Sequence, residues 1–280
     1  MRCIEHLGAS CSRYAATSTC GRDVAQATSD LPRLPSIPRA VQRAIGAATH
    51  GLMLSFVVNP AARTREKTAA AYDAMGETFD EGLASELAAV LRDNGTWQCP
   101  TLIRLHTQQF PQRHAGDPRA RFMHPRELAA WRAADERFAK LPEATREALE
   151  AHRATELAVT RVLHEEGVPM LTGTDASGAG WVVPGFALHD EFALLAEAGI
   201  AAPAILRMAT LDAARFLGRD DVAGRVAPGM QADLVVLDAD PTLDHEALSA
   251  IGGVVRAGGW FGREALDEML RRAEARPRAR

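Results

Sequence analysis

Lysine, cysteine and aromatic residues are scarce in this sequence of 280 residues, and the scarcity of cysteine excludes one class of protein. Lys67 and Lys140 are the only lysines, so arginine supplies nearly all of the positive charge. The 32 basic residues face 36 acidic ones, and this balance gives no electrostatic basis for binding nucleic acid. Four cysteines in a chain of this length and composition exclude a disulfide-dense miniprotein, they form no CxxC pair, and we expect reduced thiols.

Long hydrophobic runs are also missing. The longest apolar stretch, Leu52 to Val58, is far shorter than the roughly 18–20 residues that span a bilayer. The first six residues contain no apolar run of the signal-peptide type. We therefore expect no membrane association and, for the chain as given, a cytoplasmic location. A signal sequence upstream of Met1 would remove the basis for that location. The 47% of hydrophobic residues is typical of a globular protein with one large or two small domains.

Apolar residues recur at strand and helix spacings in turn, which predicts an α/β fold with parallel strands. We expect helices over 64–91, over 127–166 with a break near Pro142, and over 186–198, 203–217 and 261–275. We expect strands over 97–105, 169–175, 232–238 and 251–256, and a long loop over 106–125. The histidines of that loop are expected to be solvated, with a lid as the alternative: His106, His114 and His124.

The segment Leu171–Ser177 carries the strongest chemical signal. Its carboxylate, Asp175, follows a predicted buried strand, which is where α/β barrels place catalytic groups. Two nearby glycines would let another group approach it. An aspartate that caps the next loop or helix explains the same pattern equally well.

A second candidate is the short run Cys3–Leu7, which contains Glu5 followed by His6. The imidazole of His6 is suited to binding a metal ion, and Glu5 would orient the ring. Taken alone, the segment is explained more simply by an ordinary loop histidine beside a solvated glutamate.

Six short segments occur in a characteristic order over about residues 2–262. They are Ile4–Leu7, Pro100–Leu102, Gly173–Asp175, Pro184–Glu191, Leu206–Ala214 and Pro228–Leu234. Together they resemble the C-terminal part of the amidohydrolase superfamily, in its imidazolonepropionase-like and prolidase-like branch. The order of several motifs makes this resemblance specific, and it disfavours an unrelated α/β binding domain.

The resemblance implies a (β/α)8 metal-dependent hydrolase barrel joined to a small β-sandwich. This α/β chain would supply strands 6–8 of the barrel, with residues 99–105 as strand 7. We expect a partial barrel domain with helical insertions over 1–222, a remnant of the β-sandwich over 223–262, and a C-terminal helix with a basic tail over 263–280.

The resemblance also implies a site with a divalent metal, usually zinc, and a small amide or cyclic amide as substrate. His6 matches the metal-binding histidine of strand 6, and Asp175 matches the metal-binding aspartate of strand 8. A metal ion lowers the pKa of bound water to roughly 7. Asp175 would take the water's proton and return it to the leaving nitrogen. His189 would face the substrate, or would bond to a backbone group at the start of its helix.

The sequence departs from the family pattern in its ligands. It contains no His-x-His, and both lysines follow His6, so neither can be the lysine of strand 4. Two of six ligand positions are filled, whereas a zinc site normally has at least three protein ligands. Two hypotheses follow. The chain is the C-terminal fragment of a metal-dependent hydrolase of carbon–nitrogen bonds, with metal binding weak or absent in isolation, or it is a catalytically inactive truncated relative.

The number of strands makes a further prediction. Three strands cannot close an eight-stranded barrel. We expect an open, C-shaped sheet with Asp175 facing empty space. The unpaired edges of strands 6 and 8 would favour self-association and poor solubility.

Overall fold

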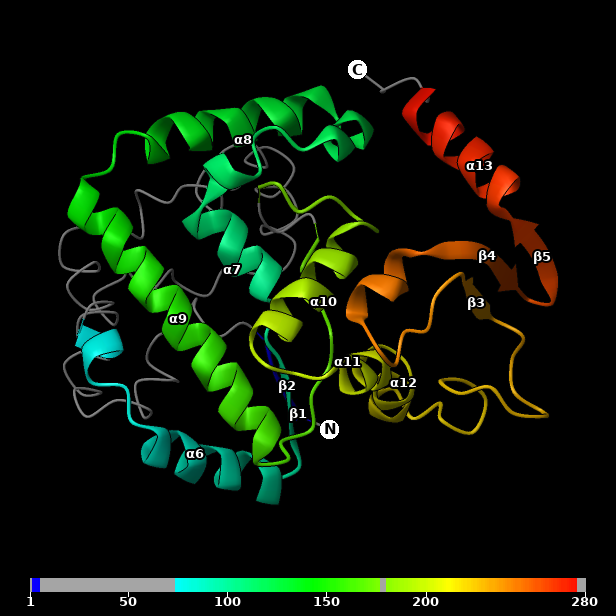
Figure 1. Cartoon of the computed structure of the whole chain (residues 1–280), viewed down its shortest axis with the longest axis horizontal. Coiled ribbons are helices and arrows are strands. Elements are labelled where there is room, and N and C mark those ends of the chain that lie inside the picture. Colours follow the sequence, from blue (N-terminus) through cyan, green and yellow to red (C-terminus); the bar gives the residue numbers. More distant parts are fainter. Residues whose placement is uncertain (1, 6–73, 177–179, 276–280) are drawn as a thin grey trace, which may run out of the picture.

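A short parallel sheet lies among the helices of the chain, for which the computed structural model describes residues 2–5, 74–176 and 180–275 (Figure 1). Strand β1 (Arg2–Glu5) pairs in parallel with β2 (Thr96–Cys99). On the other side of β2, a single parallel bridge joins Gln98 to Met170. Gln98 donates its N–H to the Pro169 carbonyl, and its own carbonyl accepts from Leu171 N, both at 2.9 Å. The three predicted strand positions therefore lie side by side in the expected order, whereas the partial barrel stays a prediction.

The expected strands over 97–105 and 169–175 are both shorter than predicted. β2 ends at Cys99, and residues 102–109 form a helix, α7 (Leu102–Gln109). Pro100 has no N–H for a strand ladder, and Thr101 turns the chain with a left-handed φ of 52°. In the second segment only Met170 is assigned to a bridge, and residues 171–175 are irregular.

The expected loop over 106–125 is also wrong, because most of it is helical. It contains the end of α7 and two 3-10 helices, η2 (Pro111–Arg113) and η3 (Pro118–Phe122). Asp117 starts η3 by accepting the N–H of Arg119 on its carboxylate at 2.8 Å.

The helical pair over 127–166 is confirmed as α8 (Pro125–Phe138) and α9 (Glu143–Glu165), with the break at the expected proline. The helix expected over 64–91 is described only from residue 74: residues 74–77 are helical, and α6 (Glu81–Asp93) follows after a break. Asp80 caps α6, since its Oδ1 accepts the N–H of Leu83 at 2.9 Å. Figure 1 shows α9 running across the molecule and meeting α6 near one end.

Helix α10 (Ala187–Glu197) is confirmed within one residue of its expected bounds. The helix expected over 203–217 is two helices, α11 (Ala202–Ala209) and α12 (Leu211–Phe216). Thr210 separates them with a non-helical φ of −124° and ψ of −88°. Its hydroxyl donates to the Leu206 carbonyl at 2.7 Å and so competes with the helical backbone bonds.

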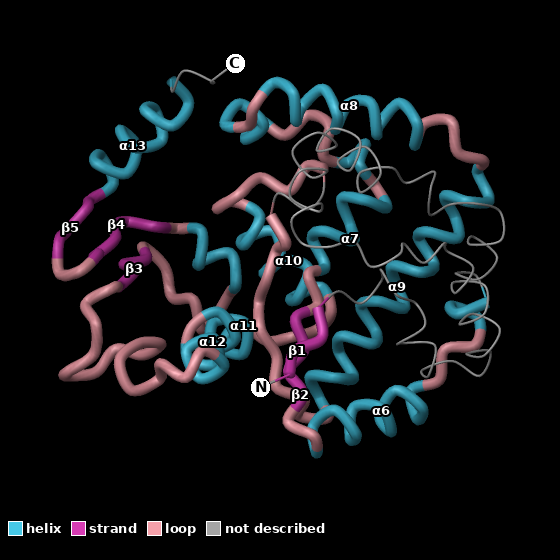
Figure 2. The backbone as a smooth tube through the Cα atoms, turned by 180° about the vertical axis from the view of Figure 1, so that it is seen from behind, coloured by secondary structure: helices cyan, strands magenta, loops and turns pink. Residues whose placement is uncertain are grey.

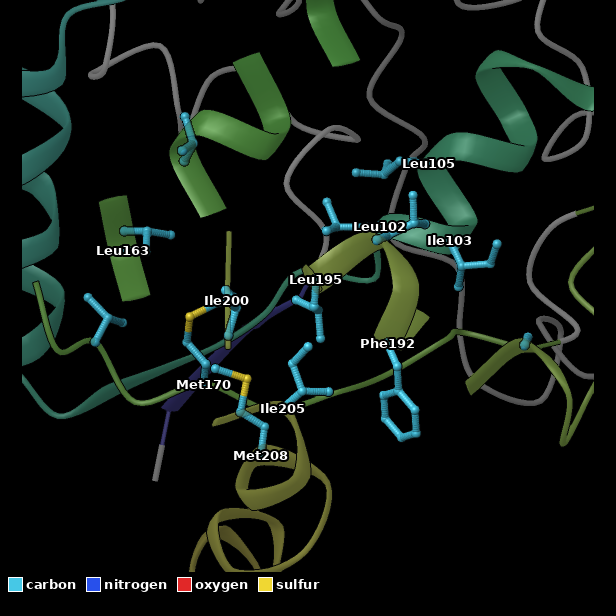
Figure 3. Close-up of a cluster of buried hydrophobic side chains, with 14 of the residues drawn as sticks. Leu102, Ile103, Leu105, Leu163, Met170, Phe192, Leu195, Ile200, Ile205 and Met208 are labelled. Carbon is cyan, nitrogen blue, oxygen red and sulfur yellow. The ribbon is translucent and has the colours of Figure 1, made fainter. Parts of the chain in front are cut away.

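The main core joins α7, α9, α10 and α11 to the segment after α9 (Figure 3). Its most deeply buried members include Leu163, Leu195 and Ile205, each at 1% exposure or less. Ten labelled side chains in Figure 3 mark it: Leu102, Ile103, Leu105, Leu163, Met170, Phe192, Leu195, Ile200, Ile205 and Met208. The core thus packs α7 and α10 against each other and includes Met170, the residue that bridges to β2.

The C-terminal part forms a separate antiparallel sheet in the order β3 (Leu234–Leu237), β4 (Ile251–Arg256), β5 (Gly259–Gly262). The chain between β3 and β4 includes η4 (His245–Ser249). Figure 2 shows this sheet and the following helix, α13 (Arg263–Ala275), at the edge of the molecule.

Both strands expected in this C-terminal part are confirmed. The helix expected from Phe261 begins two residues later, because Phe261 lies in β5. Ala257 and Gly258, with φ of 50° and 80°, make the hairpin turn between β4 and β5. The domain boundaries at 222 and 262 stay predictions. In the described ranges, no helix has the length and apolar character needed to cross a membrane.

Candidate functional site

Asp175 lies at the end of the segment that pairs with β2, and it faces a guanidinium group. Its Oδ2 is 2.9 Å from Nε of Arg104, the third residue of α7. The Asp175 side chain is 38% exposed and that of Arg104 is 10% exposed. The expectation that Asp175 faces empty space is therefore wrong, because α7 forms where a strand was expected and carries Arg104 to the carboxylate.

A glycine two residues before Asp175 allows this approach. A β-carbon at Gly173 would overlap the Sγ atom of Cys99 and would lie 3.6 Å from the methyl group of Thr101. Only glycine lets the segment pass so close to the end of β2. Asp175 itself has a left-handed φ of 48°, which aspartate tolerates better than most residues.

A buried glutamate holds the start of α7. Glu191, on α10, accepts the N–H of Leu102 on Oε1 at 3.1 Å and the N–H of Ile103 on Oε2 at 2.7 Å. Thr101 occupies the N-cap position but makes no side-chain cap bond, so Glu191 takes over that task from a distant helix. The Glu191 side chain is fully buried, and burial raises its pKa to about 8 against the opposing effect of the two backbone donors.

Sequence reasoning assigned no role to Glu191 or Arg104. Glu191 did have a visible signal, because it lies on the apolar stripe of its helix, four residues after Ala187 and four before Leu195. Arg104 had none, since the expected strand over 97–105 gave its side chain no definite neighbour.

His189 is half-buried near the start of α10. Its ring packs edge-on against Phe192, with centroids 5.6 Å apart, and burial lowers its pKa. Its Nδ1 is buried and makes no hydrogen bond in the described part of the chain. The expected role of His189 in substrate binding stays a prediction.

Two histidines of the expected loop are half-buried and lie against each other, so the expectation that they are solvated is wrong for this pair. His114 Nε2 lies 3.0 Å from Nδ1 of His106. Burial, reinforced by the nearby charges of His114, Arg153 and Arg113, lowers the pKa of His106 to about 3. Each ring therefore stays neutral near pH 7, and one nitrogen of the pair donates to the other.

An arginine links the same region to α10. Arg119, on η3, bonds to both carboxylate oxygens of Asp117 and donates to Oδ1 of Asp190 at 2.9 Å. Trp181 adds a second link, because its Nε1 donates to Asp135 of α8 at 2.9 Å. The segments after α7 are thus tied to the chain that follows Asp175.

The described residues do not fit a metal centre. Over 2–5, 74–176 and 180–275, no three histidine, cysteine, aspartate or glutamate side chains gather closely enough to hold an ion. Asp175 is engaged by Arg104, and His6 lies outside the described residues. The assignment of His6 and Asp175 as metal ligands stays a prediction.

The comparisons with known proteins establish the family. The sequence matches the amidohydrolase family over residues 47–260, and the chain belongs to that family. No curated protein matches the sequence. The resemblance expected from the six ordered segments is therefore confirmed at the level of the family.

Solved structures of amidohydrolases are similar to this chain. The bottromycin amidohydrolase is 30% identical, with a TM-score of 0.56, over 68% of this chain and 44% of that one. A Xaa-Pro dipeptidase with bound methionine in its active site is 22% identical, with a TM-score of 0.46, over 63% of this chain and 37% of that one. A Bifidobacterium longum protein assigned as a prolidase is 25% identical, with a TM-score of 0.46, over 68% and 44%. The chain thus spans less than half the length of these relatives.

Proposed function

We propose that this chain is part of a hydrolase that cleaves carbon–nitrogen bonds in small amides, including dipeptide-like and cyclic amides. The observation that carries the proposal is the place of Asp175, at the end of a segment that pairs in parallel with β2. Membership of the amidohydrolase family and the similarity to the bottromycin amidohydrolase support it.

Asp175 has the chemistry that this reaction requires. A carboxylate beside the scissile bond accepts a proton from the attacking water and gives it to the leaving nitrogen. We assign no step to a metal ion, because the described residues do not fit one. A divalent metal, zinc in the first instance, with His6 and Asp175 among its ligands, is proposed from the family resemblance alone.

The wider setting is proposed on the same sequence grounds. We place the protein in the cytoplasm, without nucleic-acid or membrane partners, and expect the open edges of the parallel sheet to support self-association. His189 is proposed to face the substrate.

The test is hydrolysis of N-acyl amino acids and dipeptides by the full chain, with zinc content measured in the same samples. Asp175→Asn should lower turnover by about 10²–10⁴-fold, the usual contribution of general acid–base catalysis. Asp267→Asn is the matched control, since it also removes an aspartate paired with an arginine, on the exposed face of α13. Equal turnover of native chain and Asp175→Asn would contradict the proposal.

The ion pair with Arg104 favours a second candidate, a catalytically inactive amidohydrolase-like protein. A carboxylate paired with a guanidinium 2.9 Å away has one oxygen engaged electrostatically before any substrate arrives. Folded native chain that hydrolyses none of these substrates, with or without added zinc, would support this candidate against the first.

A further inference from the structure

The cation at Asp175 is the point at which this chain and the family expectation disagree. The family resemblance places a metal ion at this carboxylate, whereas the structure places the Arg104 guanidinium 2.9 Å from Oδ2. Both cations need the same oxygen lone pairs. The question is whether Arg104 is fixed there by the fold or rests there by chance.

The fold fixes Arg104. It is the third residue of α7, and its backbone N–H donates to the Thr101 carbonyl at 3.1 Å. The two residues before it are held by the Glu191 carboxylate through their own N–H groups. The Arg104 side chain is 10% exposed, so its guanidinium is largely shielded from bulk water. A guanidinium buried to this degree requires an anionic partner.

The fold fixes Asp175 as well. Gly173 lets its segment approach Cys99 closely, and the left-handed φ of Asp175 aims the side chain toward α7. Left-handed backbone in a residue other than glycine is costly and persists where the surroundings enforce it. Thr101, with a φ of 52°, shows the same feature on the Arg104 side. Both ends of the ion pair are therefore set by backbone conformations that lie far apart in the sequence.

We infer that Arg104 is the resident cation of Asp175 in this chain and takes the place of a metal ion at that carboxylate. Neutralised by a guanidinium, the carboxylate attracts a second cation only weakly, and an ion 2.0–2.2 Å from its oxygen would repel the nearby positive charge. This inference opposes the zinc-ligand role that the family resemblance gives Asp175, and it leaves the hydrolysis reaction of the proposed function to its own test.

The first test measures metal binding without reference to activity. The full chain and its Asp175→Asn variant are titrated with Zn²⁺ alone by calorimetry. If Arg104 is the resident cation, the two proteins bind zinc with the same affinity, within about twofold, or bind none. A loss of affinity of tenfold or more in Asp175→Asn would show that the carboxylate holds the metal and would overturn the inference.

The second test measures the ion pair itself, by thermal unfolding of Asp175→Asn, Arg104→Met and the double variant. Asp175→Asn should lower the Tm by about 5 °C, because it removes the carboxylate charge that lies 2.9 Å from a largely buried guanidinium. The double variant should melt no lower than Asp175→Asn, since it removes that guanidinium as well. Additive losses of Tm in the two single variants would overturn the inference.

Two further variants serve as a replacement and a control in these tests. If Arg104→Met does not fold, Arg104→Lys replaces it, because it retains the charge and loses the planar donor geometry. The exposed variant Asp267→Asn should leave the Tm unchanged. Zinc binding that depends on Asp175, together with hydrolysis, would overturn this inference and leave the proposed function standing. Non-additive Tm losses in the Arg104 and Asp175 variants, with no hydrolysis by the native chain, would support this inference and contradict the proposed function.

Discussion

The buried carboxylate of Glu191 predicts that the protein becomes less stable as the pH rises. Burial raises the pKa of Glu191 from 4.5 to about 8 in the folded chain. Between these values the folded protein keeps the proton that the unfolded chain has released. The free energy of unfolding therefore falls with rising pH, and the stabilising contribution of the retained proton is lost as the pH passes through the folded pKa.

The size of this effect follows from the two pKa values. Each pH unit between them costs about 1.4 kcal/mol of the free energy of unfolding. The slope falls off near each pKa, so the change from pH 5 to pH 8 is about 3–4 kcal/mol, a large share of the ~5–15 kcal/mol that stabilises a typical domain. Glu191→Gln removes the titration and keeps the volume, but one of the two backbone N–H groups then meets an amide N–H₂. That loss costs about 1–3 kcal/mol at every pH.

The assay is urea unfolding followed by tryptophan fluorescence from pH 5 to pH 8.5, with Trp131 and Trp181 as buried reporters. The difference in unfolding free energy between native chain and Glu191→Gln isolates Glu191, because other titrating groups cancel. This difference should favour the native chain at pH 5 and should shrink or reverse by pH 8. Glu197→Gln, on the same helix, is the control. A difference that stays constant over this range would refute the reasoning.

Two further predictions concern the stability of the protein at acid pH and the close approach of the Gly173 segment to the end of β2. His106→Gln should reduce the loss of stability as the pH falls from 6.5 toward 3, because the folded protein keeps His106 neutral while the unfolded chain takes up a proton. Acid unfolding, with His245→Gln as the control, measures this loss. An acid sensitivity unchanged in His106→Gln would count against the prediction. Gly173→Ala should lower the free energy of unfolding by about 1–3 kcal/mol, because its methyl group would overlap Cys99. Gly116→Ala, with open space around it, is the control. Equal urea midpoints for the two variants would show that the approach of Gly173 to Cys99 is not tight.

Elements with strong periodicity and clear ends could be predicted from the sequence. The pair of helices α8 and α9 shows this, because a proline separates them and apolar residues repeat at helical spacing on both sides. The strand predicted over 251–256 likewise has the bounds of β4. In these elements local propensity and tertiary packing favour the same structure.

The helix α7 could not be predicted, because its formation depends on a distant residue. The run Leu102–Leu105 is short and mostly apolar, and such a run suits a buried strand or a buried helix equally. The helix forms because Thr101 turns the chain and because Glu191, 88 and 89 residues further along, accepts the N–H groups of Ile103 and Leu102. No local pattern around 102–105 contains that information.

The same dependence explains why the site was predicted in part. Three of the six family segments, Pro100–Leu102, Gly173–Asp175 and Pro184–Glu191, meet at the start of α7. Glu191 of the third holds the backbone that follows the first, and Gly173 of the second packs against the residues at the end of β2. These segments are thus held together by contacts with one another, and the order in which they occur identifies the family without revealing which cation they surround. Arg104 lies two residues after the first segment, pairs with Asp175 of the second, and belongs to none of the three. A family motif therefore located Asp175, and only the structure could locate its partner.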